Sequence, residues 1–125
     1  MREIKFRAWD PARKMMVVNA KWVEFMHYAD GTMKARNYTP EGNEQWLPVM
    51  QFTGIHDRNG VEVYEGDIVR WYVNDHETIG EVYFADGWFD MRHPERGSIG
   101  WDALRGESEV IGNIHQHPEI LEQQQ

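Results

Sequence analysis

Two short motifs have residue types and a spacing that could do chemistry. Glu65 and Asp67 are separated by one glycine, and two such carboxylates can bind a divalent metal or act as an acid and a base. His115 and His117 are separated by one glutamine, which in an extended segment places both imidazoles on the same side. A glycine between two acidic residues is more typical of a turn, and the histidines have no third ligand clearer than Glu119. We therefore interpret both motifs as structural and keep His115 and His117 as candidate metal ligands.

The sequence contains no recognisable machinery for nucleophilic or nucleotide chemistry. It has no cysteine, which excludes disulfides, thiolate nucleophiles and thiolate metal sites. No serine lies in a nucleophile elbow, and the segment GIHDRNG at residues 54–60 lacks the Lys-Ser/Thr ending of a phosphate-binding loop. We therefore expect a protein that is not an enzyme, with no catalytic residue and no cofactor.

Charge is divided unevenly along the 125 residues. Residues 1–50 have a formal charge of +2 and residues 51–125 one of −10, which gives the net charge of −8. An acidic chain repels nucleic acid overall, whereas this division suits head-to-tail self-association or binding to a basic partner. We therefore expect a homo-oligomer or a complex with another protein.

Aromatic and basic residues supply the candidate contact surface. The chain has six Trp, five Tyr and five Phe. Most of these are expected in the core of a small β protein, but a minority can form a binding face, because Trp is enriched at interface hot spots. The candidate contact residues are Lys5, Arg7, Trp9, Trp22, Trp71 and Trp88, and alternation alone does not say which Trp residues are exposed.

The first strand offers an alternative function. Lys5, Arg7 and Trp9 project from one face of it, and basic residues interleaved with an aromatic residue can bind nucleic acid. A further alternative uses the acidity of the chain, which could imitate DNA and so inhibit a host DNA-binding protein.

Alternation of apolar and polar residues predicts two β-hairpins in the first part of the chain. Residues 3–19 alternate, turn at Asp10-Pro11 and return, and residues 21–38 alternate on both sides of an Asp-Gly turn. The polar segment 39–45 is predicted to be an exposed loop. We therefore predict a mainly β fold with an N-terminal β-hairpin region at residues 1–45.

Residues 46–125 are predicted to form an SH3-like small β-barrel with a short C-terminal tail. Five short strands are expected between residues 67 and 115, among them the segment GSIGWDAL at 97–104. Pro118 is expected to end the last strand, and the tail to form one helical turn. The residues with predicted structural roles in turns, corners and bulges are Gly54, Gly60, Gly66, Asp67 and Gly112.

Three segments of the sequence form a recognisable combination. They are MREIKFRAWD at the start, MQFTGIHDRNGVEVYEGDIV at residues 50–69 and VIGNIHQHPEIL at residues 110–121. Together they resemble the YopX-like family of phage and prophage proteins. The resemblance implies a gene of a bacteriophage or an integrated element and a β-rich fold with an SH3-like barrel in the second part. It implies no activity and no active-site residue.

These observations lead to one expectation about function. We expect a non-enzymatic phage or prophage accessory protein that acts through protein–protein association in the cytoplasm of a bacterial host. No membrane association is expected, because no apolar run approaches the ~20 residues that span a bilayer.

Overall fold

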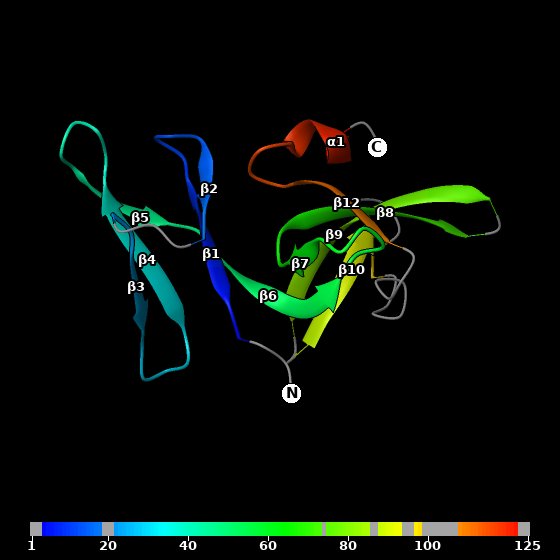
Figure 1. Ribbon diagram of the computed structural model, residues 1–125, viewed down its shortest axis with the longest axis horizontal. Coiled ribbons are helices and arrows are strands. Elements are labelled where there is room, and N and C mark those ends of the chain that lie inside the picture. The colour runs from blue at the N-terminus through cyan, green and yellow to red at the C-terminus, as the bar shows by residue number, and fades with distance from the viewer. Residues whose placement is uncertain are drawn as a thin grey trace. The chain divides into compact units, whose positions relative to one another are not determined.

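The computed structural model describes residues 4–18, 22–73, 75–85, 88–93, 97–98 and 108–122 (Figure 1). The fold is mainly β, as predicted. The strands are β1 (Phe6–Asp10), β2 (Met15–Val17), β3 (Glu24–His27), β4 (Met33–Tyr38), β5 (Glu44–Leu47), β6 (Val49–His56), β7 (Glu62–Tyr64), β8 (Asp67–Val73), β9 (His76–Ala85), β10 (Trp88–His93), β11 (Gly97–Ser98) and β12 (Glu109–Asn113), and the helix is α1 (Pro118–Glu122). Within the described residues, no helix has the length and apolar character that crossing a membrane requires.

The chain divides into two compact units. One contains Lys5–Gln51, and the other contains Phe52–Gln125 together with Met1–Ile4. Strand β6 contributes its first residues to the former and its last residues to the latter. The predicted division into an N-terminal region at residues 1–45 and a second region at residues 46–125 stays a prediction.

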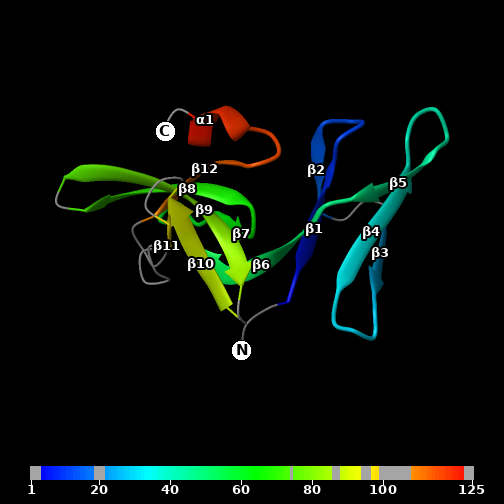
Figure 2. The ribbon, with the colours of Figure 1, turned by 180° about the vertical axis from the view of Figure 1, so that it is seen from behind.

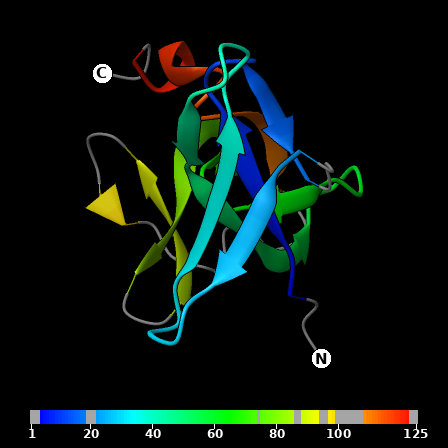
Figure 3. The same cartoon turned by 90° about the vertical axis from the view of Figure 1, so that its left-hand side faces the viewer.

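The N-terminal unit, Lys5–Gln51, is built from the two predicted hairpins, which are confirmed. Strand β1 pairs with β2 and β3 pairs with β4, both antiparallel, and β5 adds a third strand beside β4. Figure 3 shows β3 and β4 in front of β1. The alternating side chains that face inward form one apolar cluster, which supplies the main stabilisation of this unit. The buried members are Ala8, Val17, Val23, Ala35 and Leu47.

The segment expected to be an exposed loop at residues 39–45 is shorter than predicted. Thr39 and Asn43 close a tight turn, in which the Asn43 N–H donates to the Thr39 hydroxyl at 3.1 Å. Glu44 already pairs with Tyr38 as the first residue of β5. The strand was missed because β5 begins with two polar residues, Glu44 and Gln45, and its exposed positions hold Glu44 and Trp46, which do not form a regular alternation of polar and apolar residues.

The C-terminal unit, Phe52–Gln125 with Met1–Ile4, contains the five strands predicted between residues 67 and 115. Their order in the sheet is β11-β10-β9-β8-β12, all antiparallel neighbours, and Figure 2 shows β9 between β8 and β10. Of the predicted strand at 97–104, Gly97–Ser98 form β11, and residues 99–104 lie outside the described residues. The pairing shows an antiparallel sheet of five strands. That this sheet closes into an SH3-like barrel stays a prediction.

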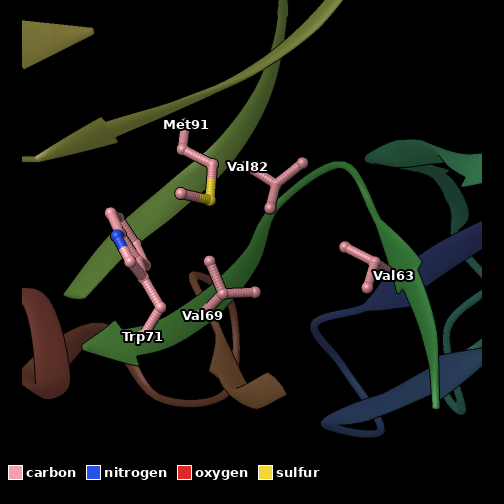
Figure 4. Packing of buried hydrophobic residues seen from close by; sticks show 5 residues of the cluster. All are labelled: Val63, Val69, Trp71, Val82 and Met91. Carbon is pink, nitrogen blue, oxygen red and sulfur yellow. The ribbon is translucent and has the colours of Figure 1, made fainter. Parts of the chain in front are cut away.

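The core of the C-terminal unit lies on one face of this sheet. Figure 4 shows Val69, Trp71, Val82 and Met91 with their side chains turned toward one another. Val63 from β7 is also fully buried in this cluster. Deleting any of these side chains would leave a cavity in a close-packed interior, at a typical cost of several kcal/mol, on the order of 2–5.

Of the five described glycines with positive φ, a conformation that other residues adopt with strain, three lie in the C-terminal unit. Gly54 has φ of +88° and lies inside β6, at a shift in the pairing with β7, so it forms an irregularity in a strand where a turn was expected. Gly66 also has φ of +88° and forms the corner between β7 and β8. Gly60 closes the turn after β6, where its N–H donates to the Asp57 carbonyl at 3.0 Å.

Candidate interaction surface

Residues of the second and third family-like segments meet in the C-terminal unit and hold its backbone together. Asp57 is the centre of this arrangement, with 6% of its surface exposed. One carboxylate oxygen accepts from the N–H groups of Asn59 (2.8 Å) and Val61 (2.9 Å), and the other from the N–H of Val110 (2.9 Å). The carboxylate of Asp57 thus links the turn at residues 57–60 to strand β12.

The hydrogen bonds of Asp57 determine its ionisation. Burial is the largest single influence and raises the pKa of Asp57, but the N–H groups of Val110, Val61 and Asn59 and the nearby charge of Arg58 together outweigh it. The net effect lowers the pKa of Asp57 below its ordinary value. Because both oxygens of this ionised carboxylate accept hydrogen bonds from backbone N–H groups, we assign Asp57 a role in stabilising the fold.

The Glu65–Asp67 motif forms a corner rather than an open pair of carboxylates. Asp67 is buried and accepts from the N–H of Tyr64 at 2.7 Å. The carbonyl of Gly66 accepts from the N–H of Ile114 at 2.9 Å, which joins the corner to the residue after β12. These contacts give the motif a role in connecting β7, β8 and the end of β12.

The two histidines of the HQH segment do not lie along an extended chain, so that premise of the metal hypothesis was wrong. The side-chain oxygen of Asn113 accepts from the N–H groups of His115 (3.0 Å) and Gln116 (2.8 Å), which folds the segment into a turn. His117 Nδ1 accepts from the Asn113 N–H at 3.3 Å, and Pro118 begins helix α1. Among the residues that the structure describes, no group of three or more His, Asp or Glu side chains has metal-binding geometry.

Gly112 lies where this turn packs against β12. The pairing of β12 with β8 shifts between Val110 and Gly112, which is a bulge in the final strand. A Cβ atom on Gly112 would lie 2.7 Å from His117 Nδ1 and 3.0 Å from Ile120 Cδ1. The absence of a side chain at Gly112 therefore allows the imidazole and α1 to lie against the strand.

The six candidate contact residues occupy different environments. Trp9 is buried in the N-terminal unit and Trp71 in the core of the C-terminal unit, whereas Trp22 and Trp88 are exposed, at 50% and 68%. Lys5 and Arg7 are half-buried. The first strand therefore presents its two basic residues without an exposed Trp9 beside them.

A different surface combines exposed aromatic and charged side chains on ordered strands. The register of β3, β4 and β5 aligns Glu24 with Arg36, Arg36 with Trp46, and Tyr38 with Glu44, so these side chains share the side of the sheet opposite the apolar cluster. We call this surface the outer face. It consists of Glu24, Met26, Tyr28, Lys34, Arg36, Tyr38, Glu44 and Trp46.

Arg36 holds the outer face together across its three strands. Its guanidinium pairs with Glu24 on β3 at 2.8 Å and with Glu44 on β5 at 3.2 Å. The hydrogen bonds that Arg36 donates to Glu24 and then to Glu44 raise the pKa of Arg36. The same guanidinium lies 5.9 Å from the ring centre of Trp46. Because one cation engages two carboxylates and a ring, its charge is balanced locally.

Lys34 is placed differently on the same face. Its ammonium lies 5.0 Å from the ring centre of Tyr28 and 5.9 Å from that of Trp46, within the range of cation–π attraction. A pocket of about 350 Å³ adjoins it, lined by Met33, Lys34, Trp46, Leu47 and Val49. The outer face thus offers a cation and two aromatic rings, beside a pocket whose Leu47 belongs to the apolar cluster on the opposite side of the sheet.

Sequence reasoning missed Lys34, Tyr28 and Trp46 as contact residues. The alternation that places Lys34 beside Arg36 is visible in the sequence, but the first two residues of the partner strand β5, Glu44 and Gln45, were predicted as part of a loop. Only the pairing of β4 with β5 brings Trp46 to Arg36. Cross-strand neighbours of this kind depend on register, which a pattern within one strand does not specify.

The comparisons with known proteins agree with this structure. A family model described as YopX protein matches residues 5–122. The crystal structure of protein EF1440 from Enterococcus faecalis is 29% identical with a TM-score of 0.66, and covers 97% of this chain and 99% of that chain. The X-ray structure of protein yopX from Bacillus subtilis is 21% identical with a TM-score of 0.62, and covers 97% of each chain. No curated protein matches the chain. Because the family model spans nearly all of the sequence, the resemblance is confirmed and the chain belongs to the YopX protein family.

Proposed function

We propose that this protein is a non-enzymatic accessory protein of a phage or prophage, which acts in the bacterial cytoplasm by binding another protein or a further copy of itself. The outer face of β3, β4 and β5 is the contact surface. The observation that carries the proposal is the exposure of Trp46, at 51%, on an ordered strand beside Arg36 and Lys34.

The composition of the outer face supports binding to protein. Trp, Tyr and Arg are the residue types that dominate interface hot spots, and Trp46, Tyr28 and Arg36 bring all three together. The two ion pairs of Arg36 fix the side chains of this face before a partner arrives, which reduces the entropy lost on binding. An enzyme would need reactive groups in a cleft, whereas Asp57 and Asp67 have their carboxylates occupied by backbone N–H groups.

The other functions considered from the sequence have less support. Binding of nucleic acid to the first strand would need an aromatic side chain for base stacking, but Trp9 is buried. Imitation of DNA would need free carboxylates, but Glu81 pairs with Arg92 at 3.5 Å and Glu109 pairs with Arg70 at 3.1 Å. Both arrangements leave these alternatives with less support than binding of a protein.

Selection of binding peptides tests the proposal. Random peptides displayed on phage are selected on immobilised protein and then measured against Trp46→Ala and the control Trp88→Ala, which removes an exposed Trp of the C-terminal unit. We expect selected peptides to bind wild type and Trp88→Ala alike, and Trp46→Ala at least about tenfold more weakly. Equal binding to Trp46→Ala would overturn the assignment of the surface. Binding of single-stranded or duplex DNA that falls steeply with salt would instead support the nucleic-acid alternative.

A further inference from the structure

Lys34 stands out among the cations of the described residues because it has aromatic neighbours and no ion-pair partner. Arg13, Arg36, Arg70 and Arg92 each pair with a carboxylate. For Lys34, no carboxylate of a described residue lies within ion-pair distance. Its ring contacts are Tyr28 and Trp46, and its charge also helps to lower the pKa of Asp30, after the hydrogen bonds of Thr32. An exposed ammonium between two rings keeps its capacity to bind an anion.

The surroundings of Lys34 define what kind of anion would fit. The pocket beside it is lined by the apolar side chains of Met33, Leu47 and Val49 and by the ring of Trp46. A ligand that fills this hollow needs a large apolar group, and its carboxylate must lie close to that group in order to reach Lys34. An extended peptide places side chains of alternate residues on the same side, about 6–7 Å apart, and so can present both.

We propose that the outer face binds an extended segment of a different protein in which an Asp or Glu lies close to a large apolar residue. The carboxylate pairs with Lys34, and the apolar side chain enters the pocket against Trp46. This inference rests on the proposed function and adds the class of partner that the surface recognises.

The charges around Lys34 favour a peptide over a nucleic acid. A polyanion would bring its successive phosphates over the carboxylates of Glu24 and Glu44, which flank Arg36 on the same face. The net charge of −8 opposes such a ligand as well. A peptide with one or two carboxylates can reach Lys34 without laying a series of charges over Glu24 and Glu44.

The charges also favour a different protein over a second copy of this chain. Among the described residues of the C-terminal unit, Glu77 and Glu81 are engaged by arginines of the same unit. Glu77 lies 3.8 Å from Arg70, and Glu81 lies 3.5 Å from Arg92. A partner whose carboxylates are not engaged in this way is a better match for Lys34.

The probes are two synthetic peptides, acetyl-Ser-Asp-Thr-Leu-Thr-Asp-Ser-amide, in which both Asp and the Leu lie on the same side of the extended chain, and the same peptide with Asn in place of both Asp. Each is titrated into the full ¹⁵N-labelled chain and followed by amide and indole chemical shifts. We expect saturable shifts at Met33, Lys34, Trp46 and Leu47, with the Asn peptide binding about fivefold more weakly, which corresponds to one partly exposed ion pair. Lys34→Gln should weaken binding of the Asp peptide by the same factor and leave the affinity for the Asn peptide unchanged. Lys14→Gln, an exposed lysine of the same unit, is the matched control.

The results separate failure of the ligand class proposed here from failure of the proposed function. If the Asp and Asn peptides bind equally, or if Lys14→Gln has the same effect as Lys34→Gln, the recognition of a carboxylate by Lys34 is wrong. If neither peptide changes the chemical shifts of outer-face residues, the ligand class is wrong. The proposed function would still be supported if peptides selected on the immobilised protein require Trp46 for binding. Light scattering tests for self-association. If the protein is an oligomer that persists in the presence of the Asp peptide but is lost in Trp46→Ala, the occupant is a second copy. If oligothymidylate shifts the same amides more strongly than the Asp peptide, the occupant is nucleic acid.

Discussion

Replacing Asp57 with Asn is a sharp test of how the family-like segments stabilise the fold. The substitution keeps the shape of the side chain but turns one acceptor oxygen into an NH₂ group. Three backbone donors at 2.8–2.9 Å use the two oxygens of Asp57, so the NH₂ must face at least one N–H group, and that donor loses its partner in a nearly buried position.

The expected cost follows from these contacts. An unsatisfied buried donor costs about 1–3 kcal/mol, and hydrogen bonds to a charged acceptor are each stronger by about 1 kcal/mol than those to a neutral one. We therefore expect Asp57→Asn to lower the free energy of unfolding by about 2–4 kcal/mol. For a chain of this size, that corresponds to a fall in Tm of roughly 10 °C.

The pH dependence provides a second readout. Because the pKa of Asp57 is lowered in the folded protein, its stabilising effect is fully present above the unfolded-state pKa, near 4, and is lost as the pH falls through the folded-state pKa. The difference in Tm between wild type and Asp57→Asn should therefore be constant between pH 6 and 8 and shrink below about pH 4.

Thermal unfolding followed by circular dichroism from pH 3 to 8 measures both effects. Asp75→Asn is the control, since Asp75 is exposed in a turn with φ of +66°, a conformation that Asn also tolerates. A Tm for Asp57→Asn within 2 °C, roughly, of the Asp75→Asn value would refute the reasoning, as would a difference that does not shrink in acid.

Three further substitutions test other parts of the fold. Gly112→Ala should destabilise by about 1–3 kcal/mol in urea unfolding because its Cβ would lie 2.7 Å from His117 Nδ1; an equal loss in a His117→Ala background would contradict this cause. Gly66→Ala should cost roughly 1–2 kcal/mol in the same assay because φ there is +88°, and an unchanged midpoint would contradict the corner geometry. Asp10→Asn should speed amide hydrogen exchange in residues 5–51, since buried Asp10 accepts from Asn37 at 2.8 Å and from backbone N–H groups; unchanged exchange there would show that this cluster adds no stability.

Most of the fold could be predicted because its signals are local. The two N-terminal hairpins and the five strands after residue 67 follow from alternation and turn residues within short segments. The boundary of β5 could not be predicted, because its identity as a strand comes from pairing with β4 rather than from its own sequence. Gly54 was expected in a turn but forms an irregularity inside β6, for a related reason. A glycine with positive φ is compatible with either a turn or a strand irregularity, and only the pairing of β6 with β7 distinguishes the two.

The candidate site was harder to predict than the fold. The sequence drew attention to Trp71 and Trp9, whose side chains are buried, because a pattern of alternation does not say which face meets the core. It missed Trp46 and Lys34, which become neighbours only through the register of β4 and β5. The HQH segment was read as extended because the capping of its turn by Asn113 is a side-chain contact that spacing does not reveal.

Photo-crosslinking in cells of the source organism tests the central claim most directly. A benzophenone amino acid replaces either Tyr38 on the outer face or Tyr72 on the C-terminal unit, which are exposed to nearly the same extent, at 56% and 54%. If the outer face is the association surface, irradiation should give a discrete protein adduct from position 38 and none from position 72. Adducts from position 72 alone, or adducts to nucleic acid from position 38, would contradict the account.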